Sequence, residues 1–370
     1  MIRNISAHNF KAFQAQEIPL RGLTLFTGLN GSGKSSALQI LLLLRQSFDV
    51  GAFLFSRINL NGAYAHLGTA QDVLNESASE DQVRIGIRTD EALYEWSLQF
   101  ERISDRTAEA VAPQNLEQTT GLFGDGFVFL AADRISPQIF YSVPDVNHKG
   151  ATSVGIHGEW TAHFLSELGS KNIAVENCAH PAARSHLLTH QVEAWMGEIS
   201  PGVRINLDAR NDLDLVGVTY SFVARRDVSA EYRPTNVGFG VTYVLPIITA
   251  VLAAKPGDLI IIESPEAHVH PRGQTKLAEL LARAASAGVQ ILVESHSDHI
   301  LNGLRVCVHD EILGTKDLKI LYFRWDVEAE DFGTTVKEID VDRDGRIAEW
   351  PEGFFDEFDK SLEALLRPIG

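Results

Sequence analysis

The chain of 370 residues is poor in cysteine and has no long apolar run. Cys178 and Cys307 are its only cysteines, so a framework of several disulfides is excluded and a reducing compartment fits best. The longest apolar run near the N-terminus, Ile40 to Leu44, falls far short of the roughly 20 residues that cross a bilayer. The opening MIRNISAHNF lacks the apolar core and the cleavage site of a signal peptide. We therefore expect a cytoplasmic protein.

Basic residues are also scarce, because 32 lysines and arginines stand against 49 aspartates and glutamates, for a net charge of −17. Proteins that grip nucleic acid alone usually carry a basic surface, since neutralised phosphates supply most of the affinity. The acidic balance favours DNA contact through a dimer or a partner protein, or serves only to keep the chain soluble. A sustained heptad repeat is missing as well, which excludes a long coiled coil.

What the sequence does contain is a glycine-rich loop between a strand and a helix. Segments 2–10, 13–20 and 23–26 read as strands, and 37–47 is rich in helix formers. Between them, the pattern G-x-x-x-x-G-K-[ST] is complete. Such a loop turns backbone N–H groups toward phosphate oxygens, with its lysine on the β- and γ-phosphates and its serine on Mg²⁺. The sequence thus predicts that ATP and Mg²⁺ bind at Asn30, Gly31, Ser32, Gly33, Lys34, Ser35 and Ser36.

An acid at the end of a neighbouring strand is needed to complete such a site. The apolar run 259–262 is typical of a buried parallel strand and ends in Glu263. A helix with a leucine-rich face follows, and then a second apolar strand, 289–293, which ends in Glu-Ser-His-Ser-Asp. We expect Glu263 and Ser35 to hold the metal.

These motifs resemble those of a known family. Ile-Ile-Ile-Glu-Ser-Pro-Glu-Ala-His-Val-His-Pro followed by Glu-Ser-His-Ser-Asp is similar to the Walker B and switch-histidine motifs of the RecF, SMC and OLD group of ABC-type AAA ATPases. Asn-Phe-Lys-Ala-Phe at 9–13 and Leu-Ala-Ala-Asp-Arg-Ile-Ser-Pro at 130–137 fit the same group. The likeness is greatest to small members without coiled coils, which occur in bacterial defence or genome-maintenance cassettes.

The resemblance implies roles for several residues. Glu263 is expected to be the Walker B acid, and His296 to sense the γ-phosphate. Ser264 stands where most such heads have the glutamate that polarises the attacking water, and serine is a poor general base. Glu266 is the candidate for that task. The expected catalytic residues are therefore Lys34, Glu263, Glu266 and His296.

A third motif, Pro-Thr-Asn-Val-Gly-Phe-Gly-Val-Thr-Tyr at 234–243, precedes the apolar segment 244–254. Its place before the Walker B strand resembles that of the signature motif in ABC-type heads. The resemblance implies that Asn236, Gly238 and Gly240 contact the γ-phosphate of a nucleotide held by a second copy, so that two heads dimerise around ATP. A glycine-bearing helix cap is the alternative interpretation.

The expected fold class is α/β, a P-loop NTPase head of the ABC type with a mixed central sheet, an antiparallel β-lobe and a short helical insert. The lobe is placed within 52–130, with strands at 83–88 and 93–100, and the loop that couples nucleotide to a partner is sought near Asn61, Tyr64 and Gln71. Helices at 160–168 and 185–196 and strands at 203–208 and 215–226 are assigned to the insert. We divide the chain into a first part of the head (1–150), the insert (151–232) and a second part of the head (233–370).

Two weaker patterns resemble metal sites, but we predict that neither binds a metal. Asp340 to Gly345 begins like a calcium loop, but Pro351 takes the twelfth position, so a tight turn is expected. His268 and His270 lack the cysteine pair of a common zinc site.

The predicted function is an ATPase head that dimerises around nucleotide and controls an effector such as a nuclease. A slow or non-hydrolysing ATP-gated switch, a transporter subunit and an intrinsic nuclease remain as alternatives.

Overall fold

A mixed sheet of six strands runs through the middle of the molecule in the computed structural model, which describes residues 1–110, 121–145, 153–224, 227–325 and 333–367. The strand order is β15-β14-β3-β13-β12-β8. All neighbours are parallel except β15, which pairs antiparallel with β14 at one edge. The strands are Leu23–Gly28 (β3), Phe127–Leu130 (β8), Leu259–Glu263 (β12), Gln290–Glu294 (β13), Leu318–Trp325 (β14) and Thr334–Ile339 (β15).

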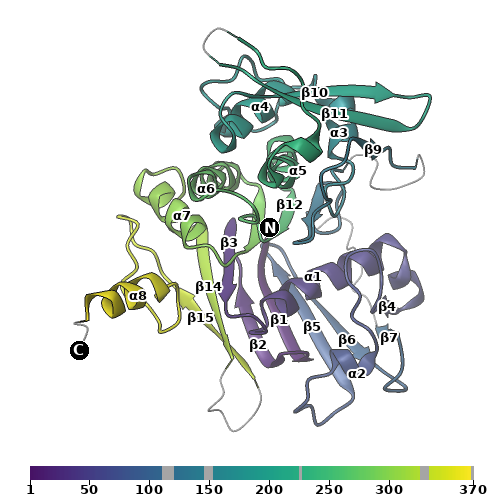
Figure 1. Ribbon diagram of the computed structural model, residues 1–370. Helices are drawn as coiled ribbons and strands as arrows, with labels where there is room; N and C mark the ends of the chain where they lie inside the picture. Colours follow the sequence, from purple (N-terminus) through teal and green to yellow (C-terminus); the bar gives the residue numbers. More distant parts are fainter. Residues whose placement is uncertain (111–120, 146–152, 225–226, 326–332, 368–370) are drawn as a thin grey trace.

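Alternate residues of the central strands face two separate cores. Ile260 and Ile262 join a core that is formed with helices, whereas Leu259 and Ile261 join a core that is shared with a second sheet. Both faces of β12 are therefore covered, which explains why its apolar run is continuous. Figure 1 shows α5, α6 and α7 on one side of the sheet and α1 with β1 and β2 on the other. These helices are Lys34–Asp49 (α1), Phe239–Ala253 (α5), Pro271–Ser286 (α6) and Asp298–His309 (α7).

The second sheet is antiparallel and has the order β2-β1-β5-β6-β7-β4. It is the β-lobe that the sequence predicts, enlarged by the two opening strands. Trp96 and Ile87 lie on its inner face, fully buried in the core shared with α1. Its strands are Ile2–Phe10 (β1), Phe13–Pro19 (β2), Arg57–Asn59 (β4), Gln82–Thr89 (β5), Leu93–Gln99 (β6) and Thr107–Ala110 (β7), with short helices at Ala52–Phe55 (η1) and Ala70–Val73 (α2).

The insert combines helices with a small sheet of order β10-β11-β9. The predicted strand 215–226 ends at Phe222, and its residues 225–226 lie outside the described residues. Val203, Val218 and Tyr220 face the helices of the insert and of the head, in one shared core. The elements are Phe140–Ser142 (β9), Thr161–Leu168 (α3), Glu176–Cys178 (η3), Leu188–Ile199 (α4), Val203–Arg210 (β10), Leu215–Phe222 (β11) and Pro234–Asn236 (η4).

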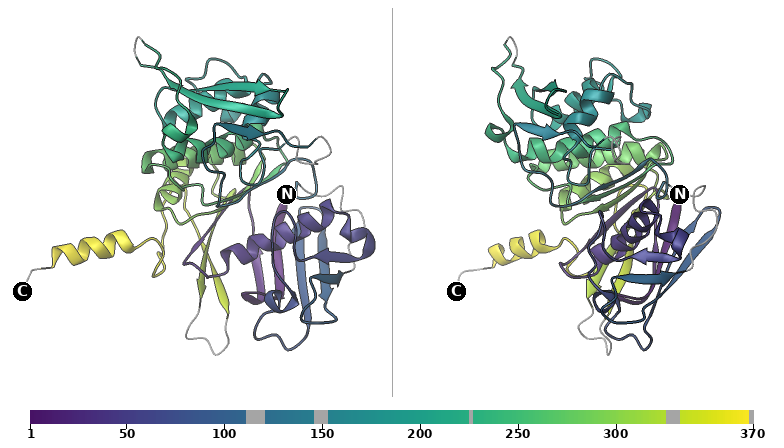
Figure 2. Two further views of the ribbon diagram at one scale, coloured as in Figure 1. Left: turned by 45° about the vertical axis from the view of Figure 1, so that its right-hand side comes forward. Right: turned by 90° about the vertical axis from the view of Figure 1, so that its right-hand side faces the viewer.

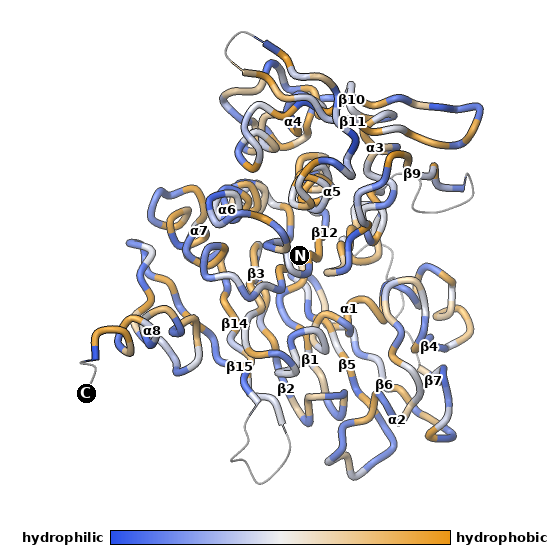
Figure 3. The backbone as a smooth tube through the Cα atoms, viewed as in Figure 1, coloured by the Kyte–Doolittle hydropathy of each residue, from blue (hydrophilic) through white to orange (hydrophobic). Residues whose placement is uncertain are grey.

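The C-terminal segment after β15 turns back on the head and then leaves it. The backbone amides of Asp344 and Arg346 donate to the Asp342 carboxylate, so the aspartate-rich stretch is a tight turn, as predicted. The last helix, Glu357–Leu366 (α8), extends away from the body in both views of Figure 2. Figure 3 shows that α5, by contrast, is orange along most of its length, as expected for a buried helix. Among the described helices, none is both long and apolar enough to cross a membrane.

Candidate functional site

The glycine loop connects β3 to α1, as the sequence predicts. Gly28, Gly31 and Gly33 have φ angles of 140°, 75° and 95°, which favour glycine over other residues. A side chain at Gly28 would also overlap the carbonyl oxygen of Phe323 on the adjacent strand β14. No side chain caps the N-terminus of α1, so its first N–H groups are available to an anion.

Lys34, the first residue of α1, has its ammonium folded back onto this loop. The Nζ atom donates to the carbonyl oxygens of Gly28 at 3.1 Å and Leu29 at 2.8 Å. It also lies 3.8 Å from a carboxylate oxygen of Glu294. Burial lowers the pKa of Lys34, and the negative charge of Glu294 opposes that shift.

Two carboxylates end the neighbouring strands β12 and β13 at the same level. Glu263 and Glu294 are direct partners in the register of this strand pair. The hydroxyl of Ser35 lies 3.2 and 3.1 Å from the two oxygens of Glu294, while the Glu263 carboxylate accepts the backbone N–H of Ala132 at 3.2 Å. Within the described structure, the predicted metal-binding serine thus bonds to Glu294 and not to Glu263.

Glu294 is not among the residues predicted from the sequence, although a signal was present. The residue ends an apolar strand in the same way as Glu263 does. Motif spacing does not show which strand lies beside the P-loop strand, and β13 separates β3 from β12. Burial raises the pKa of Glu294, whereas Lys34 and the hydrogen bond from Ser35 oppose that shift. Burial together with the charge of Glu294 raises the pKa of Glu263 to about 7.

The turn after Glu263 is held in an unusual backbone conformation. Ser264 and His268 have φ angles of 43° and 61°, in the left-handed region that non-glycine residues seldom adopt. The Ser264 amide donates to the Glu294 carbonyl oxygen at 2.8 Å. On the other side, the buried guanidinium of Arg134 donates to the carbonyl oxygens of Glu263 at 2.7 Å and Ser264 at 3.2 Å. Burial lowers the pKa of Arg134 to about 10, and the acids Glu266 and Glu263 oppose that shift.

Glu266 and His296, two of the predicted catalytic residues, are brought together by this turn. The Glu266 carboxylate accepts the backbone N–H of His296 at 2.9 Å and the hydroxyl of Ser295 at 2.8 Å. Burial lowers the pKa of His296, as does the nearby charge of Lys34. Glu266 therefore fixes the position of the segment that carries the histidine.

The predicted coupling loop is not beside the site. Asn61 bonds to Gly68 within its own loop, and the Tyr64 hydroxyl donates to Asp49 at the far end of α1. Gln71 lies exposed at the start of the short helix α2. The segment after β8, by contrast, is hydrogen-bonded both to the site and to the insert. Its Ala132 bonds to Glu263, while Ala131 and Ile135 donate to the carbonyl oxygens of Ile156 and His157 in the insert.

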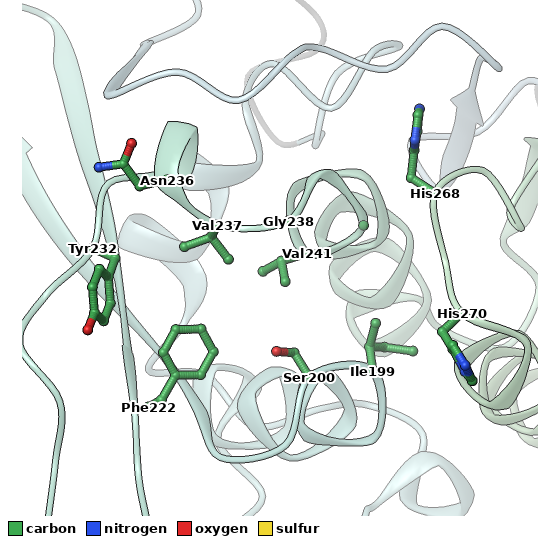
Figure 4. Close-up of a pocket in the computed structure, with 11 residues that line it drawn as sticks. Ile199, Ser200, Phe222, Tyr232, Asn236, Val237, Gly238, Val241, His268 and His270 are labelled. Atoms are coloured by element: carbon green, nitrogen blue, oxygen red, sulfur yellow. The ribbon is translucent and has the colours of Figure 1, made fainter.

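The predicted signature residues lie at the start of α5, around a pocket of 560 Å³. Gly238 caps the helix, and Gly240 packs so closely that a side chain there would overlap the carbonyl oxygen of His268. The rings of Phe239 and Tyr243 flank the His268 ring, with centroids 5.6 and 4.7 Å away. Figure 4 shows Val237, Val241 and Phe222 around the same opening. The pocket is lined by Ile199, Ser200, Phe222, Tyr232, Asn236, Val237, Gly238, Gly240, Val241, His268 and His270.

Three family models match separate parts of this chain. Residues 1–124 match a family described as an AAA ATPase domain, and residues 197–302 match one described as "AAA domain, putative AbiEii toxin, Type IV TA system". These two ranges hold the P-loop and the Walker B and switch residues. An SMC head bound to the C-terminal winged-helix domain of ScpA aligns with a TM-score of 0.53 at 14% identity, over 92% of this chain and 98% of that one. Together, the two AAA matches and the fold shared with the SMC head support an ABC-type AAA ATPase head of the RecF, SMC and OLD type.

Other matches are more distant or less informative. An SMC head domain from Thermotoga maritima aligns with a TM-score of 0.46 at 11% identity, over 92% of this chain and 99% of that one. The SMC head of Pyrococcus furiosus, bound to the C-terminal domain of ScpA, aligns with a TM-score of 0.49 at 13% identity, over 99% of each chain. Residues 313–365 match a family of unknown function, DUF3696. No curated protein matches this ABC-type head.

The residues of this head fit a nucleoside triphosphate with a divalent cation. The P-loop glycines turn backbone N–H groups inward, and Gly31 has open space where a side chain would point. Lys34 and Ser35 supply an ammonium and a hydroxyl, and Glu263 and Glu294 supply the hard oxygen ligands that Mg²⁺ prefers. Asn30, Gly31 and Ser35 are exposed at the mouth of this site, while Ser32, Gly33, Lys34 and Ser36 are buried in its wall.

Proposed function

We propose that this chain binds ATP with Mg²⁺ in the P-loop and hydrolyses it. The observation that carries the proposal is the charge arrangement at the start of α1. The Lys34 ammonium and the Ser35 hydroxyl lie 3.8 and 3.1 Å from the Glu294 carboxylate, and Glu263 ends the next strand. An ammonium aimed at a phosphate-binding loop, with a hydroxyl and two carboxylates beside it, suits a triphosphate and its cation.

Hydrolysis needs water to attack the γ-phosphorus in line with the departing ADP oxygen and to give up a proton. Lys34 would remain on the phosphates while negative charge moves toward ADP, and bound Mg²⁺ would neutralise part of that charge. Glu266 is the best base that the turn offers, because Ser264 does not titrate near neutral pH. Its bonds to Ser295 and His296 would keep the base and the γ-phosphate sensor in one unit.

We further propose that two heads enclose the nucleotide. In this arrangement Asn236, Gly238 and Gly240 would contact the γ-phosphate held by the other head. The contact of Gly240 with His268 supports the proposal, because it links the signature helix α5 to the turn after the Walker B acid. A nucleotide bound between two heads could thereby move both turns together.

The output of such a dimer would be control of an effector. An SMC head has been solved bound to the C-terminal winged-helix domain of ScpA, and this complex supports a partner-binding role for a head of the same fold. One matching family is named after a toxin of a toxin–antitoxin system, which supports a defence role. We propose that the effector is a nuclease or another DNA-linked protein and that the insert, 151–232, carries its docking surface.

Ser264 favours a second candidate function. Without a glutamate at this position, the head could bind ATP and dimerise while hydrolysing it very slowly. The chain would then be an ATP-gated switch instead of a motor.

ATP turnover and light-scattering mass, each with and without Mg-ATP, test these proposals. We expect the wild type to release phosphate, and Lys34→Ala to lose about 100-fold or more of that rate. Glu266→Gln should turn over about 100-fold more slowly and accumulate as an ATP-dependent dimer. Glu167→Gln, an exposed acid on α3, is the matched control and should behave as the wild type.

The outcomes separate the two functions. A wild type that changes mass with ATP but releases no phosphate is a switch. If ATP changes neither quantity, both proposals are wrong.

A further inference from the structure

Glu294 places a carboxylate beside the phosphate-binding loop, although a negative charge there does not help the loop to bind phosphate. Both of its carboxylate oxygens lie within 3.2 Å of the Ser35 hydroxyl, and one lies 3.8 Å from the Lys34 ammonium. The residue is 8% exposed, and Lys34 is 3% exposed, so little water screens the pair. A negative charge therefore stands beside the cation that should attract the triphosphate.

The strand register makes this arrangement a fixed one. β13 lies between the P-loop strand β3 and the Walker B strand β12, with Glu263 and Glu294 paired across the second boundary. The Ser264 amide donates to the carbonyl oxygen of Glu294, and the Ser295 amide donates to that of Phe26 on β3. The backbone on each side of Glu294 is thus bonded to both neighbouring strands, which fixes the main chain beside the P-loop. The contacts with Ser35 and Lys34 hold the carboxylate itself.

This charge acts differently on ATP with and without a cation. ATP without metal brings its full negative charge against Glu294, and the repulsion weakens the attraction of Lys34. A divalent cation on the phosphates reverses the sign of the interaction, because Glu294 then faces a positive centre through the Ser35 hydroxyl. Glu263 alone would discriminate less strongly between metal-free ATP and Mg-ATP, because its carboxylate is bonded to the Ala132 amide and not to Ser35.

We propose that Glu294 makes nucleotide binding conditional on the divalent cation, by repelling metal-free ATP and holding the cation of Mg-ATP beside Ser35. The inference rests on the proposed function and assigns a selection step to the same site. Glu294 should therefore be required for the difference in ATP affinity with and without the cation, and not for ATP binding itself.

Equilibrium binding of a fluorescent ATP analogue, titrated in EDTA and again in Mg²⁺, tests this role without measuring turnover. The wild type should bind about tenfold or more weakly in EDTA than in Mg²⁺. Glu294→Gln, which removes the charge and keeps the shape, should bind about tenfold more tightly than the wild type in EDTA, so that the ratio between the two conditions falls toward one. Glu294→Asp keeps the charge and should keep most of the ratio.

The control variants are Glu167→Gln, which should leave both affinities unchanged, and Glu263→Gln, which should change the ratio less than Glu294→Gln does. If Glu294→Gln fails to fold, Glu294→Ser takes its place in the same titrations. An unchanged ratio in the folded Glu294 variant overturns the inference, and so does a ratio that collapses only in Glu263→Gln. A wild type that binds the analogue in neither condition overturns the proposed function itself, and this inference with it.

Discussion

Cys178 of the insert and Cys307 of the head are buried in the core that these two parts share, with exposed fractions of 0% and 3%. Burial raises the pKa of each thiol to about 12, and the positive charge of Arg283 near both only partly offsets it. Each side chain is therefore shielded and also protonated at mildly alkaline pH. Because the thiolate is the reactive form, both residues should be inert in the folded protein.

We predict that iodoacetamide modifies neither cysteine of the native protein at mildly alkaline pH and both of them in guanidinium chloride. Intact-mass spectrometry counts the modified thiols. The denatured sample is the control, since its thiols return to the ordinary pKa. Rapid labelling of either residue in the native protein would show that its helix opens to solvent.

At the residue scale, the sequence identified the residues of the P-loop but not all of the side chains that surround them. Lys34 and Ser35 could be assigned because a P-loop motif fixes both residue type and spacing. Glu294 could not, because its role depends on β13 lying beside β3, which is a property of the sheet and not of any local pattern. The position of Arg134 under the Ser264 turn is likewise set by contacts between segments distant in the sequence.

At the element scale, α5 shows how packing overrides local preference. Pro246 lies inside the helix, a position that ordinarily costs about 3 kcal/mol. The helix persists because its buried side chains include Val244, Ile247 and Val251, which are all inaccessible to solvent. In the first turn of the helix, the backbone of Gly240 lies close to the turn after β12. A substitution of this glycine therefore tests the packing between α5 and that turn.

We predict that Gly240→Ala lowers the free energy of unfolding by about 1–3 kcal/mol, because the new side chain would overlap the His268 carbonyl oxygen. Gly238→Ala is the matched control, since nothing lies within 4 Å of the added atom. Its φ of −58° suits alanine, so we expect a loss below about 1 kcal/mol from the poorer helix cap. Urea unfolding of both variants is the measurement. Equal midpoints would mean that the first turn of α5 can shift away from His268.

Longer elements were predictable from periodicity, and short ones were not. The strands β1, β2, β3, β12 and β13 and the helices α1, α3 and α4 match expected segments to within a few residues. The strands β4 and β9 have three residues each, too few to show a period, and form only because partner strands are already in place. In the insert, the strands predicted at 203–208 and 215–226 correspond to β10 and β11, which pair over eight residues. Only their pairing with the short strand β9 was not predicted.

At the scale of the whole molecule, the C-terminal segment after β15 is attached to the helical core, which includes its residues Ile347 and Phe354. Phe354 is its anchor, fully buried and in ring contact with Tyr322 and Trp350 at 5.4 and 5.3 Å. Arg305 of α7 adds a contact with the Trp350 ring at 5.4 Å and a hydrogen bond to the Gly345 carbonyl oxygen at 2.8 Å. Beyond this anchor, α8 exposes Phe358 to 74%.

We predict that Phe354→Ala releases the C-terminal segment from the head while the rest of the fold survives. Truncating a buried phenylalanine typically costs about 3–5 kcal/mol, and here the loss falls on the few contacts that attach residues 340–356 to α7 and β14. Limited proteolysis followed by mass spectrometry should show early cleavage within this segment and an intact head fragment. Phe358→Ala, which removes the same side chain from an exposed position, should be cleaved as the wild type is. If the two variants give the same cleavage pattern, Phe354 does not hold the segment, and the contacts of Arg305 become the next candidate for the anchor.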